Sequence, residues 1–502
     1  MNRKLTCILA MLLLAQTAAA CGSEKSGGGN LTGESSGETT PAETEIPGPD
    51  IAPIDGGGRD FTFLGRLGDG SDYAFPNHEI LAEEQTGDTM NDAVYKRNLF
   101  IEEKYNINIV ALEEKQGDIH TKALNAIKAG DNTYDIIMPP TYRAFAMQLE
   151  GAFYNVNEIP QVDISKPWWQ GRVLDNFSIG GANFFLIGDI NFSNFNATSA
   201  IFFNKKLMDE YSLPNIYQTV LDGKWTLDVM HEYSTKVTYD LDGDAKMTGA
   251  DAYGFVSSNF GWQPLYYGCG ARIIDKDKDD IPYLAWDSEK NINIITKMTE
   301  LLNDDGATLL VNQHPDLANA VCPTSKGYGA ATVNTFTEDR ALFWVEVMYG
   351  IYQVRDMVSD FGIVPTPKYD EHQESYTSYV HTSHSSSIGV PVTNTDLALT
   401  GAILEDMAYQ SYVNVRPAFY DITLKGKLAR DEETVLMLDI IYNNINPDLT
   451  LAMNASGLTI DSKMRSIFTE DRSDIVSLIA ANKEANIAKI EANTEAILSL
   501  LK

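Results

Sequence analysis

The stretch TMNDAVYKRNLFIEEKYNINIVALEEKQGDIHTKALNAIKAGDNTYDIIMPP (89–140) contains the pattern that decides the fold. Apolar residues recur at helical spacing in two of its segments and form short runs in two others. With the preceding run FTFLGRL, it predicts five elements in order: a strand at 61–67, a helix at 89–105, a strand at 107–110, a helix at 121–129 and a strand at 134–138. Strands that alternate with helices form a parallel sheet covered by helices, so we expect an α/β fold.

The carboxyl ends of these strands indicate where a ligand would bind. Ligands of open α/β sheets sit beyond the carboxyl ends of the strands. The loops at 66–72 and 139–143 follow two such ends and are therefore candidates for a binding site. Asp88 or Thr89 would cap the helix at 89–105.

The rest of the chain predicts a second set of helices and strands. Its elements are a hairpin at 177–190, strands at 253–256, within 336–349 and at 362–370, and helices at 206–211, 225–236, 288–303, 395–413, 432–445 and 473–501. The segment FGWQPLYYGCGARI (260–273) is rich in aromatic residues and glycine, so we expect a loop there. Aromatic rings on such a loop suit the faces of sugar rings, with burial in the core as the alternative.

The first residues, MNRKLTCILAMLLLAQTAAAC (1–21), combine a basic start, a short apolar run and small residues before Cys21. This is typical of a secretory signal, and the apolar run is too short to span a bilayer. The segment resembles a bacterial lipoprotein signal, which implies that residues 1–20 are removed and that Cys21 carries lipid, palmitate included. An ordinary signal peptide with an incidental cysteine is the alternative. Residues 21–57 have little to bury, so we expect a disordered tether.

Charge and composition exclude some classes of function. The 502 residues carry a formal net charge of −32, whereas binding to a phosphate backbone requires a cationic surface. The length suggests two or more lobes. Seven scattered histidines, and the lack of a nucleophile elbow or a Gly-rich phosphate loop, argue against an enzyme. Cys269 and Cys322 could pair outside the cell, although nothing in their spacing requires it.

The segment DLDGDAKMTGAD (240–251) has the spacing of a calcium loop. Carboxylates at positions one, three and five, a carbonyl at seven and a carboxylate at twelve can surround a structural Ca²⁺ ion. The ligands would come from Asp240, Asp242, Asp244, Lys246 and Asp251. Ala245 stands where the motif has glycine, which requires a strained or rearranged turn. An acidic turn without a metal is the alternative.

Several segments together resemble the extracellular solute-binding proteins of family 1, the carbohydrate receptors of bacterial ABC importers. They are the leader, YDIIMPP (134–140), AIFFNKKLMDEY (200–211), the calcium loop, FTEDRALFWVEV (336–347), FGIVPTPKYD (361–370) and FYDITLKGKLARDEETVLMLDII (419–441). The resemblance implies a two-lobe periplasmic-binding-protein-like fold of type II with a hinge of several strands. Hinge crossings would fall near 200–204, 341–345 and 365–376. One lobe would then hold 58–199 and 336–370, and the other 200–335 and 371–502.

The resemblance also implies a function, which is that of a receptor without catalysis. A lipid-anchored monomer on the extracellular face of the cell membrane would capture an oligosaccharide between its lobes. It would deliver the sugar to the permease subunits of an ABC importer and touch the membrane through its lipid alone. Relatives carry an Asp-rich calcium loop in the same region, so Ca²⁺ would be its cofactor. A secreted carbohydrate-active hydrolase, with Glu346 and Asp189 as its carboxylates, and a surface adhesin are the alternatives.

Loop position and ring chemistry select the candidates for the sugar site. The candidate rings for stacking are Trp262 and Trp344, with Tyr142 and Tyr266 behind them and Trp168, from KPWWQ (166–170), as a further ring. The candidate groups for hydroxyl recognition are Arg66, Glu346 and His381. For Trp168 the alternative is a tryptophan pair with one ring in the core and the other half exposed.

Overall fold

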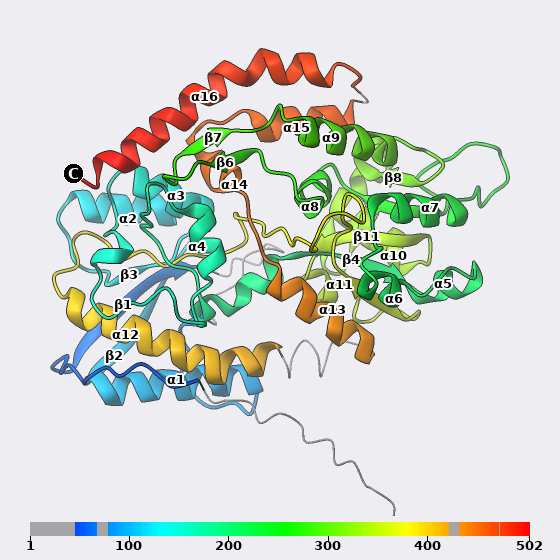
Figure 1. The fold of residues 1–502 in the computed structure, drawn as a ribbon. Helices are drawn as coiled ribbons and strands as arrows, with labels where there is room; N and C mark the ends of the chain where they lie inside the picture. Colours follow the sequence, from blue (N-terminus) through cyan, green and yellow to red (C-terminus); the bar gives the residue numbers. More distant parts are fainter. Residues whose placement is uncertain (1–45, 68–78, 421–430, 471) are drawn as a thin grey trace, which may run out of the picture. The chain divides into compact units, whose positions relative to one another are not determined.

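The computed structural model describes residues 46–67, 79–420, 431–470 and 472–502 (Figure 1). The chain divides into residues 1–47 and residues 48–502, and every element below belongs to the second unit. The predicted signal segment, Cys21 and most of the tether lie outside the described residues. Within the described ranges, no helix combines the length and apolar character needed to cross a membrane.

The first sheet is parallel, with strand order β2-β1-β3. Its strands and their connections are β1 (Arg59–Arg66), α1 (Thr89–Tyr105), β2 (Ile107–Glu114), α2 (Ile119–Lys128) and β3 (Ile136–Ile137). Phe61 lies opposite Ile109, and Leu64 lies opposite Ile137. The side chain of Asp88 caps α1. The predicted parallel α/β sheet and the bounds of the helix at 89–105 are therefore confirmed.

The second sheet is mixed and has five strands in the order β12-β4-β11-β5-β8. They are β4 (Ser199–Asn204), β5 (Tyr253–Ser257), β8 (Thr308–Leu310), β11 (Ala341–Val347) and β12 (Phe361–Val364). β4 is antiparallel to both β11 and β12, whereas β11, β5 and β8 run parallel. Each strand of the sheet is mainly buried, because helices cover both faces of its parallel part.

The strands within residues 336–370 belong to the second sheet. The predicted lobe division, which placed these residues with the first sheet, is wrong on this point. β11 lies between β4 and β5, with Trp344 opposite Phe202, and β12 pairs with β4. Conversely, α12 (Leu397–Gln410), predicted to belong with the second lobe, packs on α1, where Lys104 Nζ lies 2.5 Å from Asp406 Oδ2. The reason is physical: strand partners depend on contacts with distant segments, which a local pattern does not display.

Two segments, 197–199 and 379–381, connect the sheets as an antiparallel pair, which we call the hinge pair. The N–H of Ser199 donates to the oxygen of Tyr379 (2.8 Å), and the N–H of His381 donates to the oxygen of Ala197 (2.9 Å). The first segment leads into β4, and the chain after the second runs beside β3. The predicted crossing near 200–204 thus falls next to the hinge pair, but 341–345 lies inside β11.

Three predicted loops or turns have a different structure. Residues 260–273 contain a helix, α8 (Trp262–Gly268), and the loop predicted at 139–143 contains the start of α3 (Thr141–Leu149). The predicted hairpin at 177–190 is reduced to a single bridge between Ile179 and Ala182. The loop predicted at 66–72 falls mostly outside the described residues, and Cys269 and Cys322 are free thiols.

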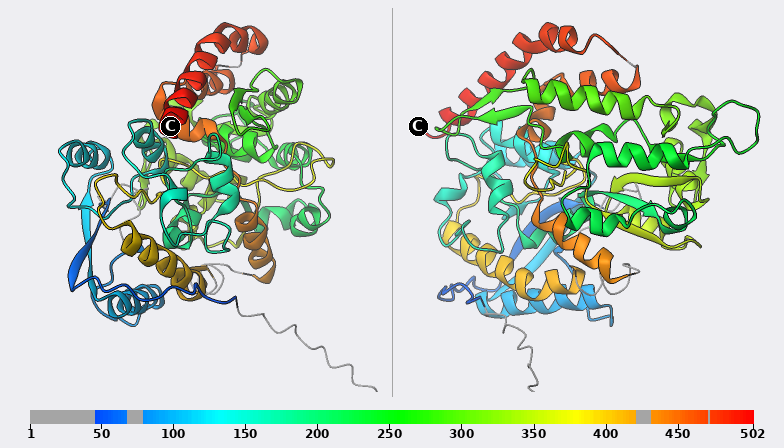
Figure 2. Two further views of the ribbon diagram at one scale, coloured as in Figure 1. Left: turned by 60° about the vertical axis from the view of Figure 1, so that its left-hand side comes forward. Right: turned by 45° about the vertical axis from the view of Figure 1, so that its right-hand side comes forward.

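The other helices and short strands surround the two sheets (Figure 2). They are α4 (Gly171–Phe177), α5 (Lys205–Glu210), α6 (Ile216–Leu221), α7 (Leu227–Val237), β6 (Ile274–Lys276), β7 (Pro282–Leu284), α9 (Glu289–Leu302), β9 (Val321–Cys322), β10 (Ser325–Lys326), α10 (Tyr328–Thr337), α11 (Gly350–Val354), α13 (Glu432–Asn443), α14 (Leu449–Met453) and α15 (Ile460–Thr469). Short 3-10 turns occupy Val156–Glu158, Asp189–Ala197, Val311–Gln313, Pro315–Asn319 and Asn454–Ser456, and a π-helical turn occupies Ser411–Val415.

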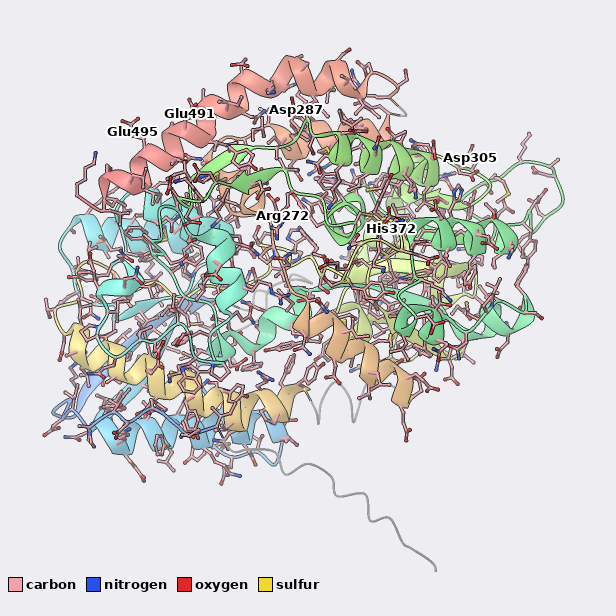
Figure 3. The ribbon with its side chains drawn as sticks, in the orientation of Figure 1. Arg272, Asp287, Asp305, His372, Glu491 and Glu495 are labelled. Atoms are coloured by element: carbon pink, nitrogen blue, oxygen red, sulfur yellow. The ribbon has the colours of Figure 1, made fainter. Side chains whose placement is uncertain are left out.

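The C-terminal helix α16 (Ile475–Ser499) crosses from elements near the second sheet to elements near the first. It packs on α15 and β7 and reaches α3 (Figure 1). Near its end, Leu498 approaches Gly180 so closely that a Cβ there would lie 2.6 Å from Leu498 Cδ2. Figure 3 labels Glu491 and Glu495 on the exposed side of this helix, whose bounds lie within the helix predicted at 473–501.

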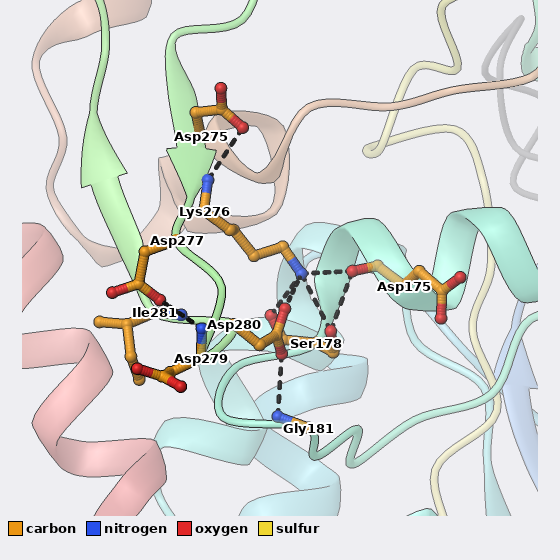
Figure 4. A network of polar contacts seen from close by, with 9 residues as sticks. All are labelled: Asp175, Ser178, Gly181, Asp275, Lys276, Asp277, Asp279, Asp280 and Ile281. Atoms are coloured by element: carbon orange, nitrogen blue, oxygen red, sulfur yellow. Dashed lines mark hydrogen bonds and ion pairs between the residues drawn. The ribbon is translucent and has the colours of Figure 1, made fainter.

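The hairpin of β6 and β7 is joined to the end of α4 by Lys276 (Figure 4). The ammonium group donates to the backbone oxygens of Asp175 and Ser178 and pairs with Asp280 Oδ1 (2.6 Å). Asp280 Oδ2 in turn accepts a hydrogen bond from the N–H of Gly181 (2.9 Å). We call this set the hairpin contact. It connects the chain that follows α8 with the chain that leads into the 3-10 turn at Asp189.

Candidate functional site

Arg66 holds a segment over the carboxyl edge of the first sheet. It ends β1 and is only 4% exposed. Its guanidinium donates to the backbone oxygens of Ser383 (2.9 Å) and His384 (2.7 Å). Residues 383–384 therefore lie across this edge, where ligands of α/β sheets bind. Arg66, expected to recognise hydroxyl groups, positions this segment in the structure.

The corresponding edge of the second sheet carries Trp262 and Glu346. β5 and β11 are parallel, so their carboxyl ends lie at the same edge. α8 follows β5 and begins at Trp262, and Glu346 is the last residue but one of β11. The topology thus brings together two residues that are far apart in the sequence.

Both tryptophans expected to stack on sugar rings are buried. Trp262 is 2% exposed, and its ring lies 6.0 Å from that of Phe468 at an interplanar angle of 26°. Trp344 is fully buried, with its ring 5.1 Å from that of Phe202. Trp344 is therefore part of the interior of the second sheet. Trp262 lies at the sheet edge, which keeps it a candidate.

A row of stacked rings runs from α8 to the edge of the first sheet. The ring of Tyr267 is parallel to that of Tyr379, with centroids 5.7 Å apart. The Tyr379 ring meets that of His381 edge-on at 5.9 Å, and His381 stacks on His384 at 4.0 Å. With Trp262 at its α8 end, we call these five residues the ring row. The hinge pair contributes its middle members, so the row crosses from one sheet to the other.

The two histidines of the ring row are neutral at physiological pH. Burial lowers the pKa of His381 to about 4. Burial, followed by the nearby His381 and Arg66, holds the pKa of His384 well below its usual range. Ser383 Oγ lies 2.8 Å from His381 Nδ1, which fixes the ring. The row therefore presents uncharged aromatic surface and hydrogen-bonding groups.

The two carboxylates of the hydrolase alternative lie in different surroundings. Asp189 is 3% exposed and accepts hydrogen bonds from Tyr442 OH (3.0 Å) and Arg416 Nη1 (3.4 Å). Burial raises its pKa to about 6. Burial also raises the pKa of Glu346, to about 7, and its Oε1 accepts a hydrogen bond from the N–H of Val347 (2.9 Å). Asp189 is thus paired with the guanidinium of Arg416, whereas the carboxyl group of Glu346 changes its charge near neutral pH.

The other two predicted rings, Trp168 and Tyr142, take part in different contacts. The indole N–H groups of Trp168 and Trp169 donate to the two carboxylate oxygens of Glu405, at 2.9 and 2.8 Å. Trp168 and Trp169 are 1% and 3% exposed, so both rings lie in the core and the pair does not divide into one buried and one half-exposed ring. Tyr142 is partly exposed at the start of α3, and the guanidinium of Arg143 lies 4.9 Å from its ring centre.

A small cavity lies beside the ring row. Its volume is about 10 Å³. Its lining residues are Trp262, Gln263, Tyr267, Thr450, Leu451, Asn454, Ile460 and Asp461. They come from α8, which follows β5, from α14 with the turn after it, which pack on α3, and from α15. The cavity is therefore enclosed by helices that approach it from both sheets. Tyr266, expected behind Trp262, is buried on the same helix.

Comparison of the sequence with known families identifies the protein class. The sequence profile described as bacterial extracellular solute-binding protein matches residues 82–345, a little over half of the chain. The chain belongs to this family. No curated protein matches this solute-binding protein.

Solved structures agree with the fold of this solute-binding protein. UspC of Mycobacterium tuberculosis is 14% identical over 86% of this chain and 100% of its own, with a TM-score of 0.54. A cyclo/maltodextrin-binding protein complexed with maltotetraose is 11% identical over 91% and 99%, with a TM-score of 0.53. A solute-binding protein from Thermotoga lettingae bound with α-D-tagatose is 12% identical over 86% and 100%, with a TM-score of 0.51. The predicted binding-protein fold is thereby confirmed.

The predicted calcium loop of this solute-binding protein has carboxylates close together. Asp240, Asp242 and Asp244 can each place one oxygen within 4.8 Å of the others. Ala245 adopts the left-handed conformation expected at the glycine position, with φ of 67°. The N–H groups of Ala245 and Gly243 donate to Asp240 and lower its pKa, which keeps that carboxylate charged.

Asp251, expected to close the calcium loop, has other partners. Its carboxylate accepts hydrogen bonds from the N–H groups of Leu241 (2.9 Å) and Thr248 (2.7 Å). The three leading carboxylates fit the oxygen ligands that Ca²⁺ prefers, and the geometry of position twelve fits less well.

Sequence reasoning did not select Gln263, Tyr267 or Tyr379 for the site. A signal for two of them was present, because Trp262 with Tyr266 and Gln263 with Tyr267 have the i, i+4 spacing of a helix. Tyr379 gave no comparable signal, because only the hinge pair brings it next to Tyr267.

Proposed function

We propose that this solute-binding protein captures a carbohydrate at the ring row, between its two sheets, and delivers it to an ABC importer. The ring row supports this most directly, because neutral aromatic rings beside buried polar atoms suit the alternating apolar and hydroxyl surfaces of a sugar. Membership of the solute-binding family supports the receptor role. The solved proteins complexed with maltotetraose and α-D-tagatose bind neutral carbohydrates, which favours the same ligand class here.

Capture requires movement of the two sheets about the hinge pair. A cavity of about 10 Å³ holds one water molecule and not a sugar ring. A sugar would therefore enter only when the helices that enclose the cavity separate, and it would be trapped when they close again.

The proposed function can be tested by ligand-induced stabilisation. Purified protein from residue 46 onward is mixed with maltotetraose, cellotetraose or mannotetraose, and Tm is measured. A ligand that binds only the folded state raises Tm, so we expect a clear rise with at least one sugar and no change in its chain length. Shortened products would show a hydrolase instead, and no response to any sugar would contradict the proposal.

The hairpin contact should strengthen binding if it forms on closure. In a Lys276→Met variant the backbone oxygens of α4 lose their cationic donor, and we expect sugar affinity to fall about tenfold. Isothermal titration would measure this change. The matched control is Lys278→Met on the same hairpin, because that side chain is 87% exposed and pairs only with its neighbour Asp279 among the described residues. Equal affinities for the two variants would show that the contact does not serve closure.

We further propose that Asp240, Asp242 and Asp244 hold a structural Ca²⁺ ion, with the Lys246 carbonyl and Asp251 completing the site. The close carboxylate oxygens and the left-handed turn at Ala245 support this. A bound cation would offset the repulsion among these carboxylates.

Calcium removal gives a direct prediction. We expect EDTA to lower Tm by several degrees and Ca²⁺ to restore it, because the ion binds only the folded loop. Asp240→Asn should abolish the response to Ca²⁺, whereas Glu495→Gln, on the exposed face of α16, should retain it. A wild-type Tm that is the same in EDTA and in Ca²⁺ would show that the loop is an acidic turn.

We also propose that lipid on Cys21 anchors the protein to the extracellular face of the membrane, with residues 21–57 as the tether. The basic start, apolar run and small residues before Cys21 support this. We expect a Cys21→Ser variant to leave the membrane fraction and appear in the soluble fraction. Retention of that variant in the membrane would contradict lipid anchoring.

A further inference from the structure

Three polar atoms on residues that line the small cavity beside the ring row have no hydrogen-bond partner among the described residues. They are the indole Nε1 of Trp262, the hydroxyl of Tyr267 and the hydroxyl of Thr450. Trp262 and Tyr267 belong to the ring row and are 2% exposed. Buried polar groups are nearly always hydrogen-bonded, and an indole N–H can only donate. These atoms therefore call for an oxygen atom within hydrogen-bonding distance.

The cavity also determines the size of the group it can accept. A volume of about 10 Å³ matches one water molecule or one hydroxyl oxygen. A carboxylate or phosphate group is larger and would displace the surrounding helices.

Charge around the cavity argues against an anion. No lysine or arginine is among its lining residues. Asp461, which lines it, accepts hydrogen bonds from Gln263 Nε2 (2.7 Å) and Arg465 Nη2 (2.6 Å), so the cation that contacts this lining residue is paired with a carboxylate. Burial, and next the nearby Asp448, hold the pKa of Tyr267 well above its usual range, which shows that a negative charge is unfavourable here.

A second cation near the cavity is engaged as well. Arg272, labelled in Figure 3, donates to the oxygen of Pro447 (3.0 Å), next to the buried Asp448 at the start of α14. Asp448 itself accepts from the N–H groups of Ile273 (3.0 Å) and Thr450 (2.8 Å). Neither arginine is available to neutralise an incoming anion, which would lose its hydration without compensation.

We propose that this cavity is a hydroxyl-selecting subsite, in which Trp262 Nε1 and Tyr267 OH bind one neutral hydroxyl group of the captured sugar. It admits neutral sugars and rejects those with a carboxylate or phosphate at the bound position. The inference rests on the proposed function, because it assigns a ligand class to the same site. Closure of the sheets places the hydroxyl, and opening replaces it with water.

The test compares two variants by stability and by affinity. Tyr267→Phe removes only the unpartnered hydroxyl and leaves the ring against Tyr379, so Tm without sugar should be unchanged or higher. Affinity for the neutral tetrasaccharide that stabilises the wild type most should fall about tenfold, by isothermal titration. Tyr376→Phe is the matched control, because Tyr376 is also buried and its hydroxyl donates to the oxygen of Val220 (2.9 Å), which does not line the cavity. It should lose stability and keep its affinity.

A second arm tests charge selection without any substitution. The same tetrasaccharide, with its primary hydroxyl groups oxidised to carboxylates, should bind the wild type at least tenfold more weakly than the neutral sugar. Unchanged affinity in Tyr267→Phe with a lowered Tm would assign the cavity to a structural water and overturn the inference while the receptor function stands. Equal binding of the oxidised sugar would also overturn it. A wild type that binds no tetrasaccharide overturns the proposed function, and the inference with it.

Discussion

A Glu405→Leu variant should lose about 3–5 kcal/mol of unfolding free energy. The carboxylate accepts hydrogen bonds from both indole N–H groups of the tryptophan pair and from the N–H of Asp163 (3.2 Å). Leucine would leave the two buried indole N–H groups without a partner, and each unpaired buried donor costs about 1–3 kcal/mol. Chemical denaturation at equilibrium would measure the loss.

This variant also tests the role of Trp168. Because Trp168 is a core residue, sugar affinity should stay at the wild-type value wherever the variant remains folded. If instead the ring contacts the sugar, affinity should fall together with stability. Glu103→Leu is the control, because Glu103 is an exposed glutamate on a helix and should change stability little.

A Glu346→Gln variant should be more stable than the wild type at pH 8 and equal to it at pH 4. Burial raises the pKa of Glu346 from 4.5 to about 7. Between these values the folded protein binds more protons than the unfolded chain, so the unfolding free energy decreases as the pH rises. Glutamine resembles the protonated side chain and removes this decrease. The unfolding free energy of the variant should therefore exceed that of the wild type by about 1–3 kcal/mol at pH 8.

Denaturation curves at several pH values would measure the effect. Glu300→Gln, at an exposed glutamate of α9, is the control and should show no pH-dependent difference. A difference between Glu346→Gln and the wild type that is the same at pH 4 and pH 8 would contradict the raised pKa.

Local patterns predicted the first sheet well. The helix at 89–105 was predicted with its bounds and its cap at Asp88, because both signals lie within a few neighbouring residues. The strand at 253–256 and the helix at 288–303 likewise agree with β5 and α9 to within one residue at each end. Apolar spacing and caps act through neighbours in the sequence, so one sequence is enough to read them.

The partners of each strand could not be predicted in the same way. The strand predicted within 336–349 is β11, but it was assigned to the wrong sheet, because its neighbours β4 and β5 are about 90–140 residues away. For the same reason, the hinge crossing predicted at 341–345 is wrong, since these residues lie inside β11. Tyr379 was not predicted as a site residue either, because its contact with Tyr267 depends on the hinge pair.

The candidate site was predicted by residue type and only partly by position. Trp262 lies at the sheet edge, and His381 belongs to the ring row. Trp344 and Trp168 are core residues. The sequence did not reveal this, because a tryptophan looks the same in a sequence whether its side chain is exposed or buried. The glycine content of 260–273 favoured a loop and obscured the helical spacing of α8.

The position of α16 has a consequence for the affinity that the receptor can reach. Its first part rests on α15, and its end lies against Gly180 near α4 and against Gly151 after α3. On the proposed hinge motion, separating the sheets requires one of these ends to be released, so the helix favours the unopened state even when no solute is present. Only the fraction of molecules that is open can load, and the apparent dissociation constant increases as that fraction falls. The strength of the contacts at the two ends of α16 would therefore set the lowest solute concentration at which the protein binds its solute.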